Sequence, residues 1–474
     1  MTDLAIRPLE ASTGKITPDT AAALRGKVRG TVALPGEDGY EVARTIWNAM
    51  VDRRPGLVVR CLGAVDVINA IKLARDEKLL LAVRSGGHNI AGNAVCDGGL
   101  LIDLSLMKSV RIDPVSRTAR VEPGATLADF DKEAQEFGLV TPLGINSTTG
   151  VAGLTLGGGF GWTTRKFGLT IDNLISADVV TADGKLVRAS ETENPDLFWA
   201  LRGGGGNFGV VTSFEFKLHP LGPEVLSGLV VHPLEKAPEL LPEFRRIAKQ
   251  APDELTTWVV MRKAPPLPFL PAEWHGKEVL IFAACYSGDM KEGEKAMKAL
   301  RGLGKPIADV VSPHPFAAWQ AAFDPLLTPG ARNYWKSHDF ADLPDAAINV
   351  ILDAVRQLPS PECEVFIAHV GGAMARVAAN ATAWPNRDAH FIMNVHTRWR
   401  DKAQDQGCIA WARHLFEAAA PFASGSVYVN FMPDDEKDRV EKAYGTNYRR
   451  LAEIKRRYDP GNLFRMNQNI RPAR

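Results

Sequence analysis

Six glycines fall within the stretch Gly150-Val151-Ala152-Gly153-Leu154-Thr155-Leu156-Gly157-Gly158-Gly159-Phe160-Gly161. Glycine adopts positive φ and lets a backbone approach another group closely, and successive N–H groups in such a segment form a nest that binds anions. A tight connection between packed elements needs the same freedom. The spacing alone leaves both interpretations open, so the neighbouring segments have to decide between them.

A second glycine cluster, Gly203–Gly206, completes the pattern Gly204-x-Gly206-x-x-Gly209. This pattern matches the dinucleotide fingerprint, which requires a strand before it and a helix after it. The sequence predicts the reverse order here, with a helix over 195–202 and a strand over 210–218. A nicotinamide-binding site of that type is therefore rejected.

The chain between the clusters and before them has mixed helix and strand character. A strand over 56–60, a helix over 64–78 and a strand over 79–83 form a predicted βαβ unit, which implies a parallel pair. Asp183-Gly184 marks a hairpin turn between strands 174–181 and 185–189. The remaining predicted elements are helices 39–50, 126–137, 436–444 and 447–458, and strands 100–103, 256–262, 277–286, 363–370, 390–399 and 426–430.

Composition excludes several classes of protein. The chain has 474 residues, of which 45% are hydrophobic and 23% charged, and its net charge is +1. These values are typical of a folded globular protein of two or three domains and give no overall attraction to nucleic acid or an anionic membrane. No apolar run approaches about 20 residues, and the beginning of the chain lacks the pattern of a secretory signal. Five scattered cysteines without a CxxC pair argue against a disulfide scaffold or a metal site and favour a cytoplasmic location.

Three segments taken together carry a resemblance. They are Arg84-Ser85-Gly86-Gly87-His88, the stretch from Gly150 to Asn173, and Tyr458-Asp459-Pro460-Gly461-Asn462-Leu463-Phe464 with Asn467-Gln468-Asn469-Ile470. In this order they resemble the FAD-linked oxidases of the vanillyl-alcohol-oxidase and berberine-bridge-enzyme superfamily, most closely its bacterial branch that contains 6-hydroxy-D-nicotine oxidase. The resemblance covers nearly the whole chain.

The resemblance implies an α+β fold with a two-part FAD-binding domain of the PCMH type and a substrate domain. The substrate domain has an antiparallel sheet covered by helices. Glycine thins out near Pro220–Pro223, which sets the expected boundary. We expect an irregular segment at 1–35, the FAD-binding domain at 36–224, the substrate domain at 225–425, and a C-terminal segment at 426–474 that returns to the FAD-binding domain.

The resemblance also implies a covalent cofactor, with His88 bonded to the flavin 8α-methyl group. A lone histidine is more often solvated or capped, so this expectation depends on its motif. Asn146 and Ser147 stand where some relatives carry a cysteine and a proline, which predicts one covalent bond rather than two. The expected cofactor-binding residues are Arg84, Ser85, Gly86, Gly87, His88, Asn89, Gly92, Gly144, Thr148, Thr149, Gly150, Gly153, Leu154, Gly158, Gly159, Gly161, Asn173, Gly209, Val211, Asn467 and Asn469.

The catalytic candidates are less well defined. Oxidation of a C–H bond by flavin needs a hydride acceptor and usually a base. Glu364 is a candidate base on a predicted strand, although a solvent-facing glutamate is an equal alternative. Asn394 and His396 are two residues apart on another strand and share a face. They either line a cleft or are structural.

Three further positions follow from the resemblance. Tyr428 matches a segment that returns to the flavin, and Thr149 lies where relatives control the access of dioxygen. Phe167 replaces a tyrosine that serves the base in many plant members, so the plant alcohol-oxidation machinery is not expected. Trp319, Tyr334 and Trp335 either stack on an aromatic substrate or pack in the core.

The expected function is an FAD-dependent oxidase. It takes a hydride from a C–H beside an amine or hydroxyl of a small organic substrate and passes the electrons to O2, which gives H2O2. The alternatives are a dehydrogenase or secondary-metabolite tailoring enzyme of the same fold, and a flavin-binding protein without turnover. The sequence leaves the substrate and the oligomeric state open.

Overall fold

The computed structural model describes residues 16–474. The first fifteen residues of the segment predicted to be irregular therefore lie outside the described residues. The remainder of that segment is ordered, which corrects the prediction: helix α1 (Pro18–Arg25) begins at Thr17, whose hydroxyl accepts a hydrogen bond from the Thr20 N–H. Strand β1 (Thr31–Ala33) then pairs with β2 (Leu57–Arg60).

The N-terminal region, residues 16–221, begins with a four-stranded sheet in the order β1-β2-β4-β3. Helix α3 (Ala64–Asp76) buries its apolar residues Val67, Ala70, Ile71 and Ala74 and connects β2 to β3 (Leu81–Arg84). These two strands run in the same direction but do not pair with each other, because β4 (Leu100–Asp103) inserts between them and is parallel to both. Helix α2 (Tyr40–Arg44) is shorter than predicted.

A five-stranded antiparallel sheet, in the order β5-β6-β10-β8-β9, completes the N-terminal region. The predicted hairpin over Asp183-Gly184 is confirmed by β8 and β9. The helix–glycine–strand order that excluded a nicotinamide fingerprint is also confirmed, with α7 before Gly204 and β10 after Gly209. The elements are β5 (Val110–Asp113), β6 (Thr118–Val121), α4 (Leu127–Gln135), β7 (Leu139–Val140), α5 (Val151–Leu156), α6 (Thr164–Phe167), β8 (Leu174–Val180), β9 (Leu186–Ser190), α7 (Pro195–Leu201), β10 (Val210–Lys217) and β11 (His219–Pro220).

An eight-stranded antiparallel sheet dominates the second half of the chain, in the order β15-β12-β14-β13-β18-β19-β17, with β16 also paired to β12. Strands β12 and β17 were not among the predicted elements. The elements are β12 (Glu224–Pro233), α8 (Ala237–Gln250), β13 (Leu255–Lys263), β14 (Glu278–Tyr286), α9 (Met290–Arg301), β15 (Ala308–Asp309), β16 (Ser312–Pro315), α10 (Phe316–Gln320), β17 (Arg332–Phe340), α11 (Asp345–Val355), β18 (Glu364–His369), β19 (Phe391–Trp399) and α12 (Asp405–Ala419).

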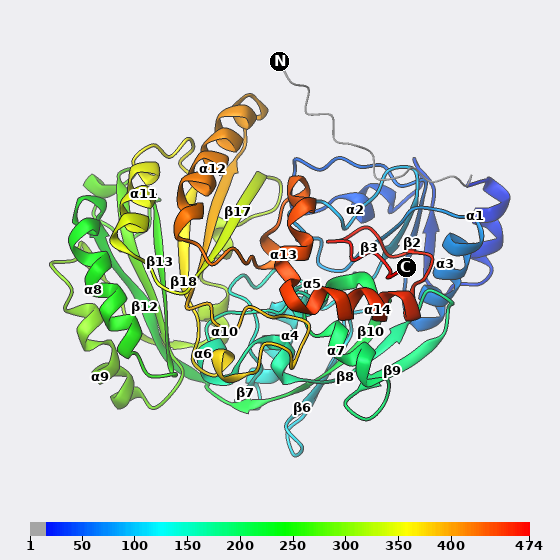
Figure 1. Ribbon diagram of the computed structural model, residues 1–474, viewed down its shortest axis with the longest axis horizontal. Coiled ribbons are helices and arrows are strands. Elements are labelled where there is room, and N and C mark those ends of the chain that lie inside the picture. The colour runs from blue at the N-terminus through cyan, green and yellow to red at the C-terminus, as the bar shows by residue number, and fades with distance from the viewer. Residues whose placement is uncertain (1–15) are drawn as a thin grey trace.

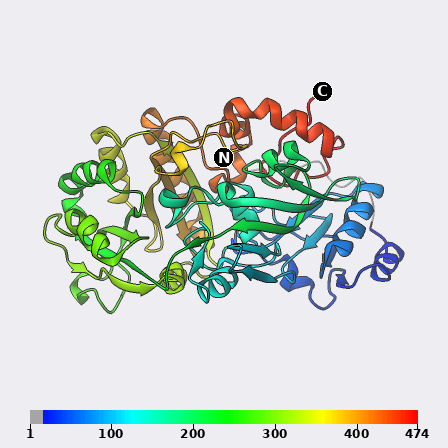
Figure 2. The ribbon, with the colours of Figure 1, turned by 90° about the horizontal axis from the view of Figure 1, so that it is seen from below.

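The two faces of this sheet have different neighbours. Helices α8, α9, α11 and α12 cover the outer face and share the largest apolar core with it (Figure 1). The inner face is turned towards the N-terminal region. Figure 2 shows the resulting elongated shape, with the early, blue elements at one end and the green and yellow elements of the eight-stranded sheet at the other.

The last part of the chain returns to the N-terminal region (Figure 1). Helices α13 (Val440–Tyr444) and α14 (Tyr448–Tyr458) pack there, α14 against α7. The predicted strand at 426–430 is wrong: the backbone bends into a 3₁₀ turn at Val429–Phe431, where the Phe431 N–H bonds the Tyr428 carbonyl. A segment that turns in this way cannot join a ladder.

A buried ion pair lies at the C-terminal end of α14. Lys455 Nζ lies 2.6 Å from Asp459 Oδ2 and also donates to the carbonyls of Asn207 and Phe464. Asp459 in turn accepts the N–H groups of Leu463 and Phe464. This network explains the Tyr-Asp-Pro motif structurally, because it fixes the final segment against the second glycine cluster.

Candidate active site

A cavity of about 380 Å³ lies between the N-terminal region and the inner face of the eight-stranded sheet. The loop after β3, the start of α5, the segment before β10 and residues 464–468 form one wall. Strands of the eight-stranded sheet form the other. Of the expected cofactor-binding residues, those that line the cavity are Ser85, Gly86, Gly87, His88, Asn89, Gly144, Thr149, Gly150, Gly153, Leu154, Gly209, Val211 and Asn467.

Two positions of the first wall require glycine, because the backbones of two segments approach each other closely there. A Cβ atom built on Gly86 would lie 2.4 Å from the Gly150 nitrogen, and one built on Gly150 would lie 2.6 Å from the Gly86 nitrogen. Real Cβ atoms do not come this close to backbone, so both positions exclude side chains. The two segments that suggested a cofactor site in the sequence therefore meet in space, and both contribute residues to the lining of the same cavity.

His88 lies in this wall with one ring face covered. The ring of Trp47 stacks on it at a centroid distance of 5.1 Å and an angle of 18°. Its Nε2 atom lies 3.1 Å from the Thr148 hydroxyl. Burial lowers the pKa of His88 to about 4, although the contact with Thr148 acts in the opposite direction. At neutral pH the imidazole is uncharged, and a neutral imidazole retains a nucleophilic nitrogen.

The other expected cofactor-binding residues do not line the cavity, and several have clear structural roles. Arg84 donates to the carbonyls of Val42 and Ala43. Asn173 donates to two carbonyls and contacts the ring of His219, which stacks on Phe167 at 4.1 Å. The residues of this group are Arg84, Gly92, Thr148, Gly158, Gly159, Gly161, Asn173 and Asn469.

The opposite wall carries a row of cross-strand neighbours. The register pairs Arg262 on β13 with Glu364 on β18, then Glu364 with His396 on β19, and His396 with Trp335 on β17. All four side chains line the cavity. Paired residues in a sheet point to the same face, so the row follows directly from the strand order.

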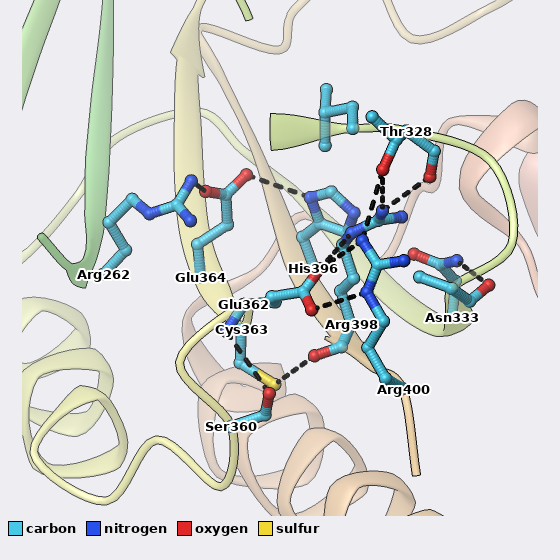
Figure 3. Close-up of polar contacts among 12 residues, drawn as sticks. Arg262, Thr328, Asn333, Ser360, Glu362, Cys363, Glu364, His396, Arg398 and Arg400 are labelled. Carbon is cyan, nitrogen blue, oxygen red and sulfur yellow. Dashed lines mark hydrogen bonds and ion pairs between the residues drawn. The ribbon is translucent and has the colours of Figure 1, made fainter. Parts of the chain in front are cut away.

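Glu364 is held by both of its neighbours in the row (Figure 3). Its Oε2 atom accepts from Arg262 Nη1 at 2.7 Å, and its Oε1 atom lies 3.0 Å from His396 Nδ1. Burial alone would raise the pKa of Glu364, but the charge of Arg262 and the hydrogen bond to His396 outweigh it and lower the pKa to about 2. The carboxylate is thus ionised at neutral pH. His396 Nε2 is buried and has no partner among the described residues.

The remaining catalytic candidates occupy different positions. Tyr428 lines the cavity, and its hydroxyl accepts hydrogen bonds from the Gly159 N–H at 3.2 Å and from Asn430 Nδ2 at 2.9 Å. Burial raises the pKa of Tyr428 to about 12, so the phenol keeps its proton. Thr149 lines the cavity beside Gly150, whereas Asn394 is fully buried behind the lining.

Sequence reasoning missed Arg262 and Trp47, although both border the cavity. Arg262 ends a strand whose inward positions Trp258 and Val260 are apolar, so strict alternation would have placed it on the same face. The three aromatic candidates differ in their positions. Trp335 lines the cavity, whereas Trp319 and Tyr334 do not. The Tyr334 hydroxyl instead donates a hydrogen bond to Asp435.

Three further observations concern metal ligands, cysteine and membrane-spanning helices. Among residues 16–474, no cluster of three or more histidine, cysteine or acidic side chains is arranged to hold a metal ion. Asn146, at the position where some relatives carry a second flavin-linked cysteine, lines the cavity, and none of the described lining residues is a cysteine. No helix in the described part of the chain is long and apolar enough to cross a membrane.

The unpaired polar atoms around the cavity indicate that it holds a ligand. Trp162 Nε1, Trp335 Nε1, Tyr444 Oη and Asn467 Oδ1 are all buried without a hydrogen-bond partner among the described residues, and each belongs to the lining. Buried polar groups are normally satisfied. A glycine-lined wall together with such unsatisfied atoms fits an elongated polar cofactor such as FAD.

Comparison with known proteins agrees with this geometry. Residues 55–190 match a family described as "FAD binding domain", and residues 427–471 match one described as "Berberine and berberine like". The chain is 32% identical to an FAD-linked oxidoreductase of Dictyostelium discoideum, over 94% of this chain and 95% of that one. It is also 32% identical to (R)-6-hydroxynicotine oxidase of Paenarthrobacter nicotinovorans, over 94% of this chain and 97% of that one.

Solved structures show the same fold. A crystal structure of 6-hydroxy-D-nicotine oxidase from Arthrobacter nicotinovorans has a TM-score of 0.86 at 30% identity and covers 94% of this chain and 98% of its own. A xylooligosaccharide oxidase of Myceliophthora thermophila has a TM-score of 0.84 at 25% identity, over 96% and 99% of the two chains. The chain therefore belongs to the family of FAD-linked oxidoreductases with a berberine-bridge-enzyme-like C-terminal segment, and it is an FAD-linked oxidoreductase.

Proposed function

We propose that this protein is an oxidase with FAD bound covalently through His88. It removes a hydride from a C–H next to an amine or hydroxyl group of a small organic substrate, and O2 is the final acceptor. The observation that carries the proposal is the position of His88 and His396 on opposite walls of one cavity. One wall offers a nucleophilic imidazole for the cofactor, and the other offers an imidazole whose Nε2 atom has no protein partner and can take up a proton.

The glycine wall fits the cofactor. The backbone at Gly86 and Gly150 borders the cavity without side chains, which suits the binding of a pyrophosphate. His88 is uncharged at neutral pH, as a nucleophile must be. When bound, the flavin supplies the hydride acceptor of the reaction.

His396 is assigned as the base. Its Nε2 atom is buried without a protein partner, while Nδ1 is held by Glu364 at 3.0 Å. Proton uptake at Nε2 forms an imidazolium that the ionised Glu364 stabilises, and Arg262 keeps Glu364 ionised. Loss of the hydride and of this proton converts a CH–XH group into C=X. Dioxygen takes up the two electrons and two protons as hydrogen peroxide.

Two other residues have supporting roles. Tyr428 fixes the glycine segment through the Gly159 N–H and keeps a proton that it can donate to a ligand in the cavity. Thr149 presents a small side chain to the cavity next to Gly150, which would suit the access of dioxygen to a bound flavin. Asn394 receives no catalytic role, because its side chain lies outside the lining.

The covalent bond is tested by precipitating the purified protein with acid and recording spectra of the washed pellet and the supernatant. We expect yellow flavin in the pellet, and its loss from the pellet of His88→Ala. His414→Ala, at an exposed histidine on α12, is the matched control and should retain it. Flavin in the supernatant of the unaltered protein would contradict the assignment of His88.

The oxidase reaction is tested with an oxygen electrode and a peroxide assay over amines, alcohols and sugars. Substrate-dependent uptake of O2 with formation of H2O2 is the expected result. Rapid reduction of a dye with little O2 uptake would identify a dehydrogenase instead. Flavin that no substrate bleaches under anaerobic conditions would favour a flavin-binding protein without turnover.

A further inference from the structure

The cavity continues past the Arg262–Glu364–His396 row into an apolar end. The inward positions of β12, β13 and β14 form its floor, and the register places Val231, Ile281 and Val260 side by side across these strands. The connection between β13 and β14, residues 264–277, folds over this floor. Its apolar side chains Leu267, Phe269 and Leu270 also line the cavity.

This connection is anchored at its base and apolar along its inner side. The Ala264 N–H bonds the Lys277 carbonyl, and the Gly276 N–H bonds the Ala264 carbonyl. Leu270 joins Val231 and Ile281 in one apolar cluster. Phe269 is 36% exposed. Phe269 therefore lies at the edge between the cavity and solvent, in the position of a rim residue.

The charged side chains of the Arg262–Glu364–His396 row do not extend into the apolar end of the cavity. Arg262 and Glu364 neutralise each other through their contact at 2.7 Å, and His396 lies on the side of Trp335 and Trp47. The floor beyond Arg262 consists of valine and isoleucine side chains. A hydroxyl group placed there would lose its hydrogen bonds to water without replacement.

We propose that the substrate carries an extended apolar tail that lies on the Val231–Ile281–Val260 floor beneath residues 264–270. Its amine or hydroxyl group lies at His396. The substrate class is thus a tailed alcohol or amine rather than a sugar. The identity of the reacting group depends on the proposed function, but the tail site follows from the lining of the apolar end alone.

The test measures binding to the flavin-loaded protein under anaerobic conditions, with quenching of tryptophan fluorescence as the readout. The probes are benzyl alcohol, a series of 4-alkylbenzyl alcohols from methyl to hexyl, and cellobiose. Each added methylene should lower the Kd by about threefold to fourfold until the apolar end is filled. A Kd that does not depend on chain length, or tighter binding of cellobiose, would overturn the proposal.

Variants of the covering connection locate the effect. Leu267→Ser with Phe269→Ser should raise the Kd of 4-hexylbenzyl alcohol about tenfold and that of benzyl alcohol by much less. Phe137→Ser is the matched control, since Phe137 is 50% exposed and outside the cavity lining. It should leave the whole series unchanged. Equal effects of the double variant on short and long probes would overturn the tail site.

The two proposals fail in different ways. Length-dependent binding without reduction of the flavin would retain the tail site and reject the oxidase function. Turnover of alcohols with no dependence on chain length would do the reverse.

Discussion

The two walls of the cavity are built by different means. The N-terminal wall is made of backbone: glycines from segments 84–89 and 150–161 approach so closely that side chains are excluded. The opposite wall is made of side chains, which single residues on β13, β18, β19 and β17 contribute through their register. A wall made of backbone is encoded within short stretches of sequence, whereas a wall made of side chains from several strands exists only after the sheet has formed. The first wall suits a constant cofactor and the second a variable substrate.

The largest effect should come from breaking the backbone wall. Gly150→Val places a branched side chain where a Cβ already lies 2.6 Å from the Gly86 nitrogen, so we expect loss of bound flavin and a stability loss of about 1–3 kcal/mol. Flavin absorbance per protein and thermal unfolding measure both. Gly407→Ala on α12, where nothing lies within 4 Å, is the control. Flavin content equal to that of the control would show that the close approach is not required.

Breaking the side-chain wall should leave the flavin in place. His396→Gln removes the proposed base, and we expect kcat to fall by about 10²–10⁴-fold with the flavin spectrum unchanged. Rapid-reaction reduction of the flavin is the direct measurement. A fall in flavin content as large as that in kcat would mean that the two walls are not independent.

The pH dependence of stability tests how much the charge of Glu364 contributes to the side-chain wall. Because its pKa is lowered to about 2, its ionised form contributes stability that is fully present above about pH 4.5 and is lost as pH falls towards 2. Glu364→Gln also leaves Arg262 without its partner. We expect a loss of about 3 kcal/mol at pH 7, which shrinks as the pH falls through that window. Denaturant unfolding at several pH values checks the sign, and a loss that grows at low pH would contradict it.

An effect of the opposite sign is expected at the junction between the two parts. Asp131 on α4 accepts from Gln320 Nε2 on α10 at 3.1 Å, and burial raises its pKa to about 7 against the effect of that bond. A raised carboxyl pKa means that stability is lost as the pH rises from about 4 through 7. Asp131→Asn should therefore stabilise the protein by about 4 kcal/mol well above pH 7 and change little at pH 4. Glu133→Gln, exposed on the same helix, should show no such dependence.

The difference between the walls also explains what could be predicted from sequence. The glycine motifs led to the cavity-lining position of His88, to the fold family and to the rejection of the nicotinamide fingerprint, because each feature is encoded within a few neighbouring residues. The prediction of a parallel pair did not include the insertion of β4 between the two strands, because strand order depends on partners far along the chain. Strands β12 and β17 were not predicted.

The same limit applies to individual site residues. Glu364 and His396 were selected from their strands, but Arg262 was missed, since its role depends on a register with β18 that no local pattern reveals. Asn394 shares a face with His396, yet it lies one row further along and is covered. Alternation predicts which face a side chain occupies but not whether another element covers it.

The Lys455–Asp459 pair has a consequence for the order of assembly during synthesis. It fixes residues 464–468, which form part of the cavity wall, against Asn207 from the middle of the chain. The wall therefore remains incomplete while a ribosome is still making the preceding residues. We therefore expect the complete flavin site to form only after residues 464–468 have been translated.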